Sequence, residues 1–113
     1  MKKFEKFEEV YNYRKSLSNT GWLYIKYDDF QDLENAEYYT FEKGEITPDD
    51  MIETDDDVVP RVLYEIDKTI TGLVENHIFQ AIYENMEETG KDFTLEEKIE
   101  ALYHYVEEDT FMY

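Results

Sequence analysis

Residues 22–27 read Trp-Leu-Tyr-Ile-Lys-Tyr and directly follow Gly21. The run is dense in aromatic and β-branched side chains, which favour extended backbone, so it is the strongest strand candidate in the chain. A second run of this kind, Glu-Tyr-Tyr-Thr-Phe-Glu at 37–42, ends at Lys43-Gly44. The two runs are far enough apart to form an antiparallel pair joined by a longish loop.

The segment before these strands has helical periodicity over residues 2–17. Apolar side chains recur along it at spacings of three, four and six residues, and they form one stripe: Phe4, Phe7, Val10, Tyr11 and Leu17. This is the only part of the chain in which bases outnumber acids. The pattern predicts a basic N-terminal helix that ends at the turn-forming residues 18–21.

Two more helices are predicted after the strands. Residues 73–88 carry an apolar face and are followed by Gly90, a plausible stop; the face consists of Leu73, Val74, Ile78, Ala81, Ile82 and Met86. The other helix begins at Thr94, where Thr94-Leu95-Glu96-Glu97 has the spacing of a capping box. The apolar tail 111–113 is expected to pack back on the domain.

The middle of the chain is harder to assign. Residues 45–60 are bracketed by Pro48 and Pro60 and rich in acids, and they predict an exposed loop with one helical turn after Thr47-Pro48. Residues 61–69 fit either a third strand or a helix. Because strands and helices are segregated, we expect one α+β domain over residues 1–113, a small antiparallel sheet of two to four strands packed against three helices on one face.

Charge narrows the possible partners. The 113 residues include 29 acids and 11 bases, a net charge of −18. Such a field excludes nucleic acid and anionic membranes as direct electrostatic partners, and it favours a cationic protein. Aromatic residues make up 17% of the chain, which argues against a disordered acidic tail. No apolar stretch has the length of a signal peptide or a membrane span, and a cytoplasmic location is expected.

The sequence shows no chemistry. The absence of cysteine excludes a structural disulfide, a thiolate zinc site and a cysteine nucleophile. His77 and His104 lie on different predicted helices and have no ligand spacing, and no glycine-rich phosphate loop is present. The contiguous acids 55–57 lack the alternation and the central glycine of a calcium loop. We therefore expect no catalytic activity, no cofactor and no dedicated metal site.

The acids are concentrated between residues 28 and 57, where thirteen of them face a single base, Lys43. Like charges at this density repel and cost stability, and nothing in the core needs them. Tyrosines are interleaved with the acids, and alternation makes one of Tyr38 and Tyr39 point away from the core face of a strand. Exposed tyrosine beside carboxylates suits a protein interface. The predicted partner-binding residues are Tyr38, Tyr39, Asp49, Asp50, Glu53, Asp55, Asp56 and Asp57.

This layout resembles small acidic immunity proteins of bacterial toxin systems, including those of contact-dependent growth inhibition. The resemblance is carried by the N-terminal helix, Gly21-Trp22 at the start of a strand, the acidic stretch 48–60 and the ending 103–111. It implies a non-enzymatic antitoxin that neutralises one cognate toxin domain in the cytoplasm, commonly a nuclease. Such a protein either fills the active site of the toxin or binds beside it and blocks access.

An alternative is a phage-type inhibitor that mimics nucleic acid, such as an anti-restriction or anti-CRISPR protein. It would also be small, acidic and free of cysteine, and it would carry its acids in rows spaced like phosphates. A further open question is the basic N-terminal segment, which can dock on the acidic face of its own chain or on that of a second copy.

Overall fold

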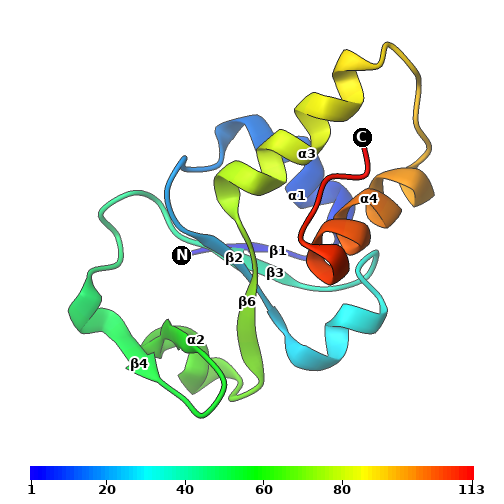
Figure 1. Ribbon diagram of the computed structural model, residues 1–113. Helices are drawn as coiled ribbons and strands as arrows, with labels where there is room; N and C mark the ends of the chain where they lie inside the picture. Colours follow the sequence, from blue (N-terminus) through cyan, green and yellow to red (C-terminus); the bar gives the residue numbers. More distant parts are fainter.

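The strand predicted at 22–27 lies inside a four-stranded antiparallel sheet with the order β1-β3-β2-β6 in the computed structural model, which describes residues 1–113 (Figure 1). Its strands are β1 (Lys2–Phe4), β2 (Trp22–Lys26), β3 (Tyr38–Thr40) and β6 (Ile70–Glu75). A separate two-stranded hairpin consists of β4 (Met51–Glu53) and β5 (Val58–Pro60). The α+β class and the small antiparallel sheet are therefore confirmed.

Three helices cover one face of the sheet: α1 (Phe7–Tyr13), α3 (Asn76–Glu88) and α4 (Leu95–Glu108) (Figure 1). Leu23 and Ile25 of β2 point toward this face, as strand alternation requires. They join the main core of 17 buried residues, in which Phe7, Phe79 and Tyr83 pack edge to face. This face matches the predicted arrangement of a sheet against three helices.

The opposite face of the sheet is also covered, which the sequence did not indicate. The hairpin and a short helix, α2 (Arg61–Ile66), lie against it. A second core of five buried residues joins them to the sheet: Tyr24, Tyr39, Val59, Leu63 and Ile70. The expectation that helices lie on one face only is therefore wrong.

The predicted N-terminal helix begins later than expected. Lys2 to Phe4 form strand β1, which pairs with β3 and places Lys3 opposite Tyr39. The helix covers Phe7–Tyr13 and continues as a 3₁₀ turn at Arg14–Ser16. The apolar spacing was misleading because Phe4 enters the core from a strand and Phe7 from a helix. Lysine on an edge strand is a common protection against edge-to-edge pairing.

The helix predicted at 73–88 begins at Asn76 instead, because Leu73 and Val74 belong to β6. The pairing of β2 with β6 shifts register at Leu23/Tyr24, so that Leu73 is an extra residue in β6. This bulge allows two consecutive residues, Leu73 and Val74, to enter the main core. On a helix, the same apolar pair fits the stripe, which explains the error.

The middle segment contains more structure than a loop. The helical turn after Thr47 is confirmed as a 3₁₀ turn at Pro48–Asp50, but the residues that follow form the β4–β5 hairpin. Of the two alternatives for residues 61–69, the structure has the helix α2, with Leu63 fully buried. Its apolar neighbours Val62 and Ile66 are exposed, so the alternation that suggested a strand has no buried face behind it.

The C-terminal predictions are confirmed. Thr94 and Glu97 form the capping box of α4, with the Glu97 amide donating to Thr94 Oγ1 at 3.1 Å. The tail folds back toward α3 and α4 (Figure 1), where the ring of Tyr113 lies 4.9 Å from that of Phe93. None of the helices is long and apolar enough to cross a bilayer.

Candidate partner-binding surface

Tyr38 and Tyr39 point to opposite sides of the sheet, as alternation predicts, but neither is exposed. Tyr38 is 0% exposed in the main core, and Tyr39 is 3% exposed beneath the hairpin and α2. The Tyr38 hydroxyl donates to the carbonyl of Leu33, and burial raises the pKa of Tyr38 far above 10. The expectation that one of the pair faces solvent is therefore wrong, because the second face of the sheet is covered too.

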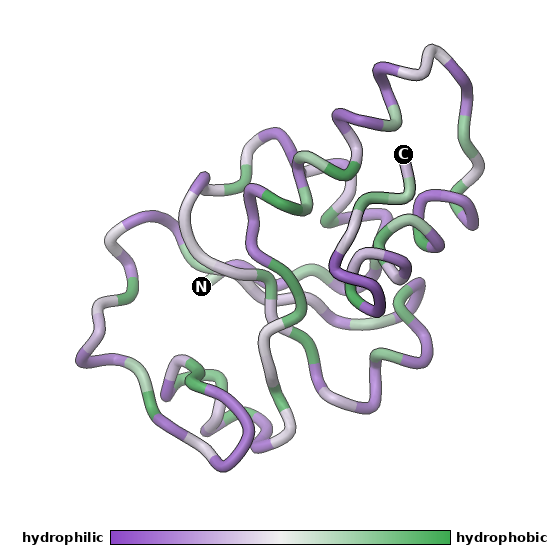
Figure 2. Tube along the Cα trace, in the orientation of Figure 1, coloured by the Kyte–Doolittle hydropathy of each residue, from purple (hydrophilic) through white to green (hydrophobic).

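The predicted acids have different roles in the structure. The Asp50 carboxylate accepts hydrogen bonds from the amide and the hydroxyl of Thr47, at 2.8 and 3.0 Å, and thus caps the 3₁₀ turn. These bonds lower the pKa of Asp50. Asp49, Glu53, Asp55 and Asp56 are exposed. Their side chains make no hydrogen bond or ion pair. Figure 2 shows the turn of the hairpin as a hydrophilic segment.

Asp57 has a structural function. It is half-buried, and its Oδ1 accepts from the amide of Val58 at 2.8 Å. Its Oδ2 accepts from the hydroxyl of Thr71 at 2.9 Å and from the amide of Gly72 at 3.0 Å. The carboxylate thereby connects the hairpin to β6, an edge strand of the sheet.

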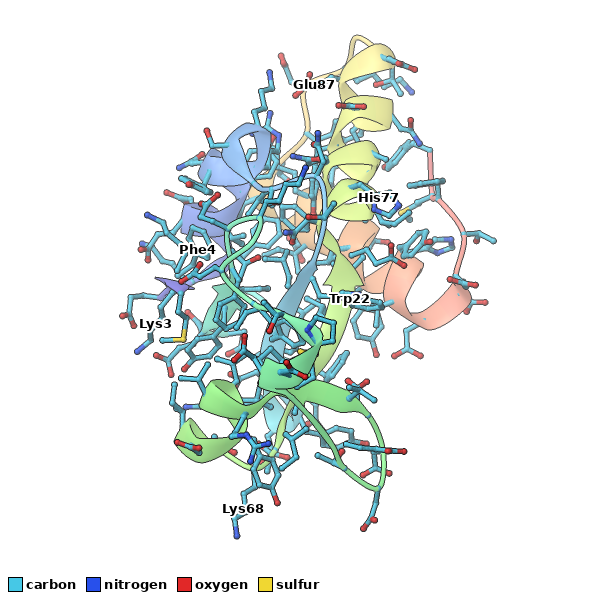
Figure 3. The ribbon with its side chains drawn as sticks, turned by 90° about the vertical axis from the view of Figure 1, so that its left-hand side faces the viewer. Lys3, Phe4, Trp22, Lys68, His77 and Glu87 are labelled. Atoms are coloured by element: carbon cyan, nitrogen blue, oxygen red, sulfur yellow. The ribbon has the colours of Figure 1, made fainter.

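The hairpin covers only part of the sheet face. Trp22 lies on the uncovered part, next to β6 (Figure 3). Its ring packs over Gly72, where a Cβ would come within 3.1 Å of the indole Cε3 atom. Glycine is thus the residue that lets the indole approach the strand this closely. The side chain remains 42% exposed, a large fraction for tryptophan on a small domain.

Two grooves meet at Trp22. The first, about 280 Å³, is lined by Trp22, Tyr24, Met51, Asp57, Val58 and Gly72, and we call it the Trp22 groove. The second, about 400 Å³, continues from Trp22 along the loop that contains Lys43 and Gly44. Asp57 is the only charged residue in the lining of the Trp22 groove. An aromatic ring and a carboxylate therefore share one small concave site.

A third groove, about 550 Å³, shares Asp57 and Gly72 with the Trp22 groove. Tyr27 is 68% exposed there and packs edge to face with Phe30, at 6.0 Å between ring centroids. Asp56 and Lys68 also line this groove. We call the exposed surface formed by Trp22, Val58, Tyr27, Asp56 and Asp57 the groove surface.

Three bases of the N-terminal segment, Lys3, Arg14 and Lys15, pair with acids of the same chain, and none of these acids lies in the hairpin. Lys3 Nζ lies 2.6 Å from a carboxylate oxygen of Glu37, and Arg14 lies 2.6 Å from Glu87. The ammonium groups of Lys3 and Lys26 lower the pKa of Glu37. Lys3 and Arg14 thus pair with acids of their own chain. The acids at 49–57 lie in no ion pair.

The remaining titratable groups do not assemble into a site. His77 is exposed beside Glu75, and the His104 ring nitrogen Nε2 lies 3.4 Å from the Thr110 hydroxyl. No group of three or more histidine, aspartate or glutamate side chains is placed to hold a metal ion.

Sequence reasoning placed the interface at Tyr38 and Tyr39 and missed Trp22 and Tyr27 as exposed aromatics. A usable signal existed for Trp22, because alternation along 22–26 puts it on the side opposite the core residues Leu23 and Ile25. Comparisons of the chain with protein-family models, with curated proteins and with solved structures found no match.

Proposed function

We propose that this chain is a non-enzymatic immunity protein, which binds a cationic bacterial toxin domain in the cytoplasm and blocks its active site or the access of substrate. A nuclease is the expected toxin, because its active site must be basic to hold phosphate. The observation that carries the proposal is the groove surface: exposed Trp22 and Tyr27 lie beside Asp56 and Asp57, which form no ion pair within the fold although Lys68 lines the same groove as Tyr27.

The charge of the chain supports the same reading. A net charge of −18 on 113 residues would steer a cationic partner toward it, and opposite fields bring association to about 10⁸–10⁹ M⁻¹s⁻¹ at low salt. Aromatic side chains within an acidic rim would then supply the short-range contacts, since tryptophan, tyrosine and arginine dominate interface energies. No step of this function requires a bond to be made or broken.

The test begins with the reading frame next to this gene. Expressed alone in a bacterial host, the neighbouring protein should arrest growth; expressed with this chain, it should permit growth and co-purify as a stable complex. If the neighbour is harmless, or if this chain gives no protection, the immunity proposal is wrong. A protein that mimics nucleic acid would instead compete with DNA or RNA on a host nucleoprotein.

The surface involved can be tested on the purified complex. Reversing Asp55 and Asp56 to lysine should slow association at low salt and weaken its salt dependence, because both side chains are exposed and make no hydrogen bond in the fold. The matched control reverses Glu107 and Glu108, which are equally exposed but lie at the end of α4. Equal slowing in both variants would show that total charge matters and the hairpin does not.

A further inference from the structure

We infer that the Trp22 groove is a slot for one arginine side chain of the partner protein. The inference rests on the proposed function for its biological setting, and it identifies the residue type that the surface is built to receive. It depends on how an indole ring and a carboxylate are placed around Gly72.

The indole supplies a fixed aromatic surface. One side of its six-membered ring rests against Gly72, since the position of a Cβ there is 3.1 Å from Cε3 and 3.5 Å from Cζ3. The side chain is still 42% exposed, so part of the ring is open to the groove. A cation near the face of tryptophan is attracted by the ring quadrupole more strongly than by that of any other aromatic residue.

Asp57 supplies the charge. Its Oδ2 lies 3.4 Å from the same Cβ position above Gly72, so that ring and carboxylate border one small space. A carboxylate has about four acceptor positions, and the fold uses three of them, one on Oδ1 and two on Oδ2. One acceptor position on Oδ1 is left for a donor from outside.

The rest of the lining favours a cation with an apolar stem. Tyr24, Met51 and Val58 provide apolar surface, and no basic residue of this chain lines the groove. Burial, together with the charge of Asp57, raises the pKa of Tyr24 to about 12, so its phenol is neutral at physiological pH. A negative charge in the groove is therefore left without a countercharge from the fold.

Arginine fits these features better than lysine does. A guanidinium is planar, stacks on an aromatic ring and at the same time donates hydrogen bonds in its plane, and it is less strongly hydrated than an ammonium group. One group can thus stack on Trp22 and donate to Asp57. The ammonium group of lysine loses more hydration than a guanidinium does, and it has no planar surface to stack on the indole.

The experiment uses the full chain and three blocked tripeptides, acetyl-Gly-X-Gly-amide, in which X is arginine, lysine or citrulline. Citrulline has the shape of arginine without its charge. Binding is followed by NMR through the indole N–H of Trp22, the only tryptophan, and through the amide of Gly72. The arginine peptide should move both signals at millimolar concentration, lysine should bind more weakly, and citrulline about tenfold more weakly or not at all.

Two variants and a control make the result decisive. Trp22→Leu should weaken binding of the arginine peptide about tenfold, as measured at the amide signal of Gly72. Gly72→Ala keeps the indole ring but displaces it, and this variant should also bind the arginine peptide more weakly. Tyr103→Leu, which removes an exposed aromatic side chain on α4, should leave binding unchanged. Three results would each overturn the slot. The citrulline peptide could bind as tightly as the arginine peptide, or both groove variants could bind the arginine peptide as tightly as the parent does. The arginine peptide could also shift only NMR signals from other acidic segments.

The slot and the proposed function can fail separately. If the toxin complex forms and dissociates at the same rate with Trp22→Leu as with the parent, the slot is wrong and the immunity function stands. If the arginine peptide binds as described but the chain neutralises no toxin, the slot stands and the immunity function is wrong.

Discussion

The Asp57 carboxylate joins the hairpin to the sheet, and its removal should destabilise the fold more than the removal of any neighbouring acid. Asp57→Ala deletes all three of its hydrogen bonds, at 2.8, 2.9 and 3.0 Å. Two of the donors are backbone amides, which cannot turn to find another partner. Asp55, two residues earlier, is exposed and makes no such bond, so Asp55→Ala is the matched control.

The magnitude follows from those bonds. A hydrogen bond to a charged group contributes about 1.5–3 kcal/mol, but water can reach this half-buried site and replace part of the loss. We therefore expect Asp57→Ala to lower the free energy of unfolding by about 2–4 kcal/mol. Asp57→Asn keeps one acceptor oxygen and should cost about half as much, whereas Asp55→Ala should stay within about 0.5 kcal/mol.

The assay is urea denaturation followed by tryptophan fluorescence and by circular dichroism. Trp22 is the only tryptophan and borders the same groove as Asp57, so its emission reports on the hairpin side of the sheet. Far-ultraviolet circular dichroism reports on the helices of the other face. If the fluorescence transition of Asp57→Ala has a lower urea midpoint than the circular dichroism transition, the hairpin detaches from the sheet before the main core unfolds.

The reasoning would be refuted if Asp57→Ala and Asp55→Ala had the same midpoint and slope. That result would mean that the hairpin is held by Val59 and Leu63 in the second core alone, and that the three hydrogen bonds only replace bonds to water.

Three further predictions concern the rest of the fold. Thr94→Ala removes the cap of α4 and should lower the free energy of unfolding by about 1 kcal/mol in urea denaturation. Asn76→Ala leaves a buried threonine hydroxyl and a backbone carbonyl without their donor and should cost about 2 kcal/mol by the same assay; a change below 0.5 kcal/mol would contradict this. The pairs of Glu37 with Lys3 and Lys26 lower the pKa of its carboxyl from 4.5, so their stabilisation is present above pH 4.5 and is lost as the pH falls through the lowered pKa. Glu37→Gln should be less stable than the parent at neutral pH, and the difference in urea midpoint should shrink in acid.

Sequence patterns predicted the fold correctly where residues close together in the chain determine the local structure. The Thr94 capping box forms as expected because its two hydrogen bonds connect residues three apart. The strand at 22–26 forms as expected because its alternating side chains enter both cores, Leu23 and Ile25 on one face and Tyr24 on the other.

The signals failed where the outcome depends on distant residues. Leu73 enters the core from a strand bulge, which is fixed by pairing with β2, about 50 residues earlier in the chain. Lys2 to Phe4 become a strand only because β3 offers a free edge. Val58 to Pro60 pair with β4 across a short turn that sequence reasoning assigned to an acidic loop.

The candidate surface lies at other aromatic residues than the sequence predicted. The sequence indicated exposed tyrosines beside the acids of residues 28–57, and the structure places exposed aromatic residues next to acids at the groove surface. The aromatics, however, are Trp22 and Tyr27, because the covering of the second face buries Tyr38 and Tyr39. Among the acids, Asp57 could not be distinguished from Asp55 or Asp56, since its three donors come from contacts that no local pattern shows.

The hydrogen bond from Gly72 to Asp57 also bears on how copies of this protein meet one another. β6 is the last strand of the sheet, and an open strand of this kind can recruit a neighbouring chain and start a fibril. Here the amide of Gly72 already donates to the Asp57 carboxylate, so it is not free to pair with an incoming strand. Pairing of a second copy along β6 is therefore hindered at Gly72 by the same residue that borders the proposed slot.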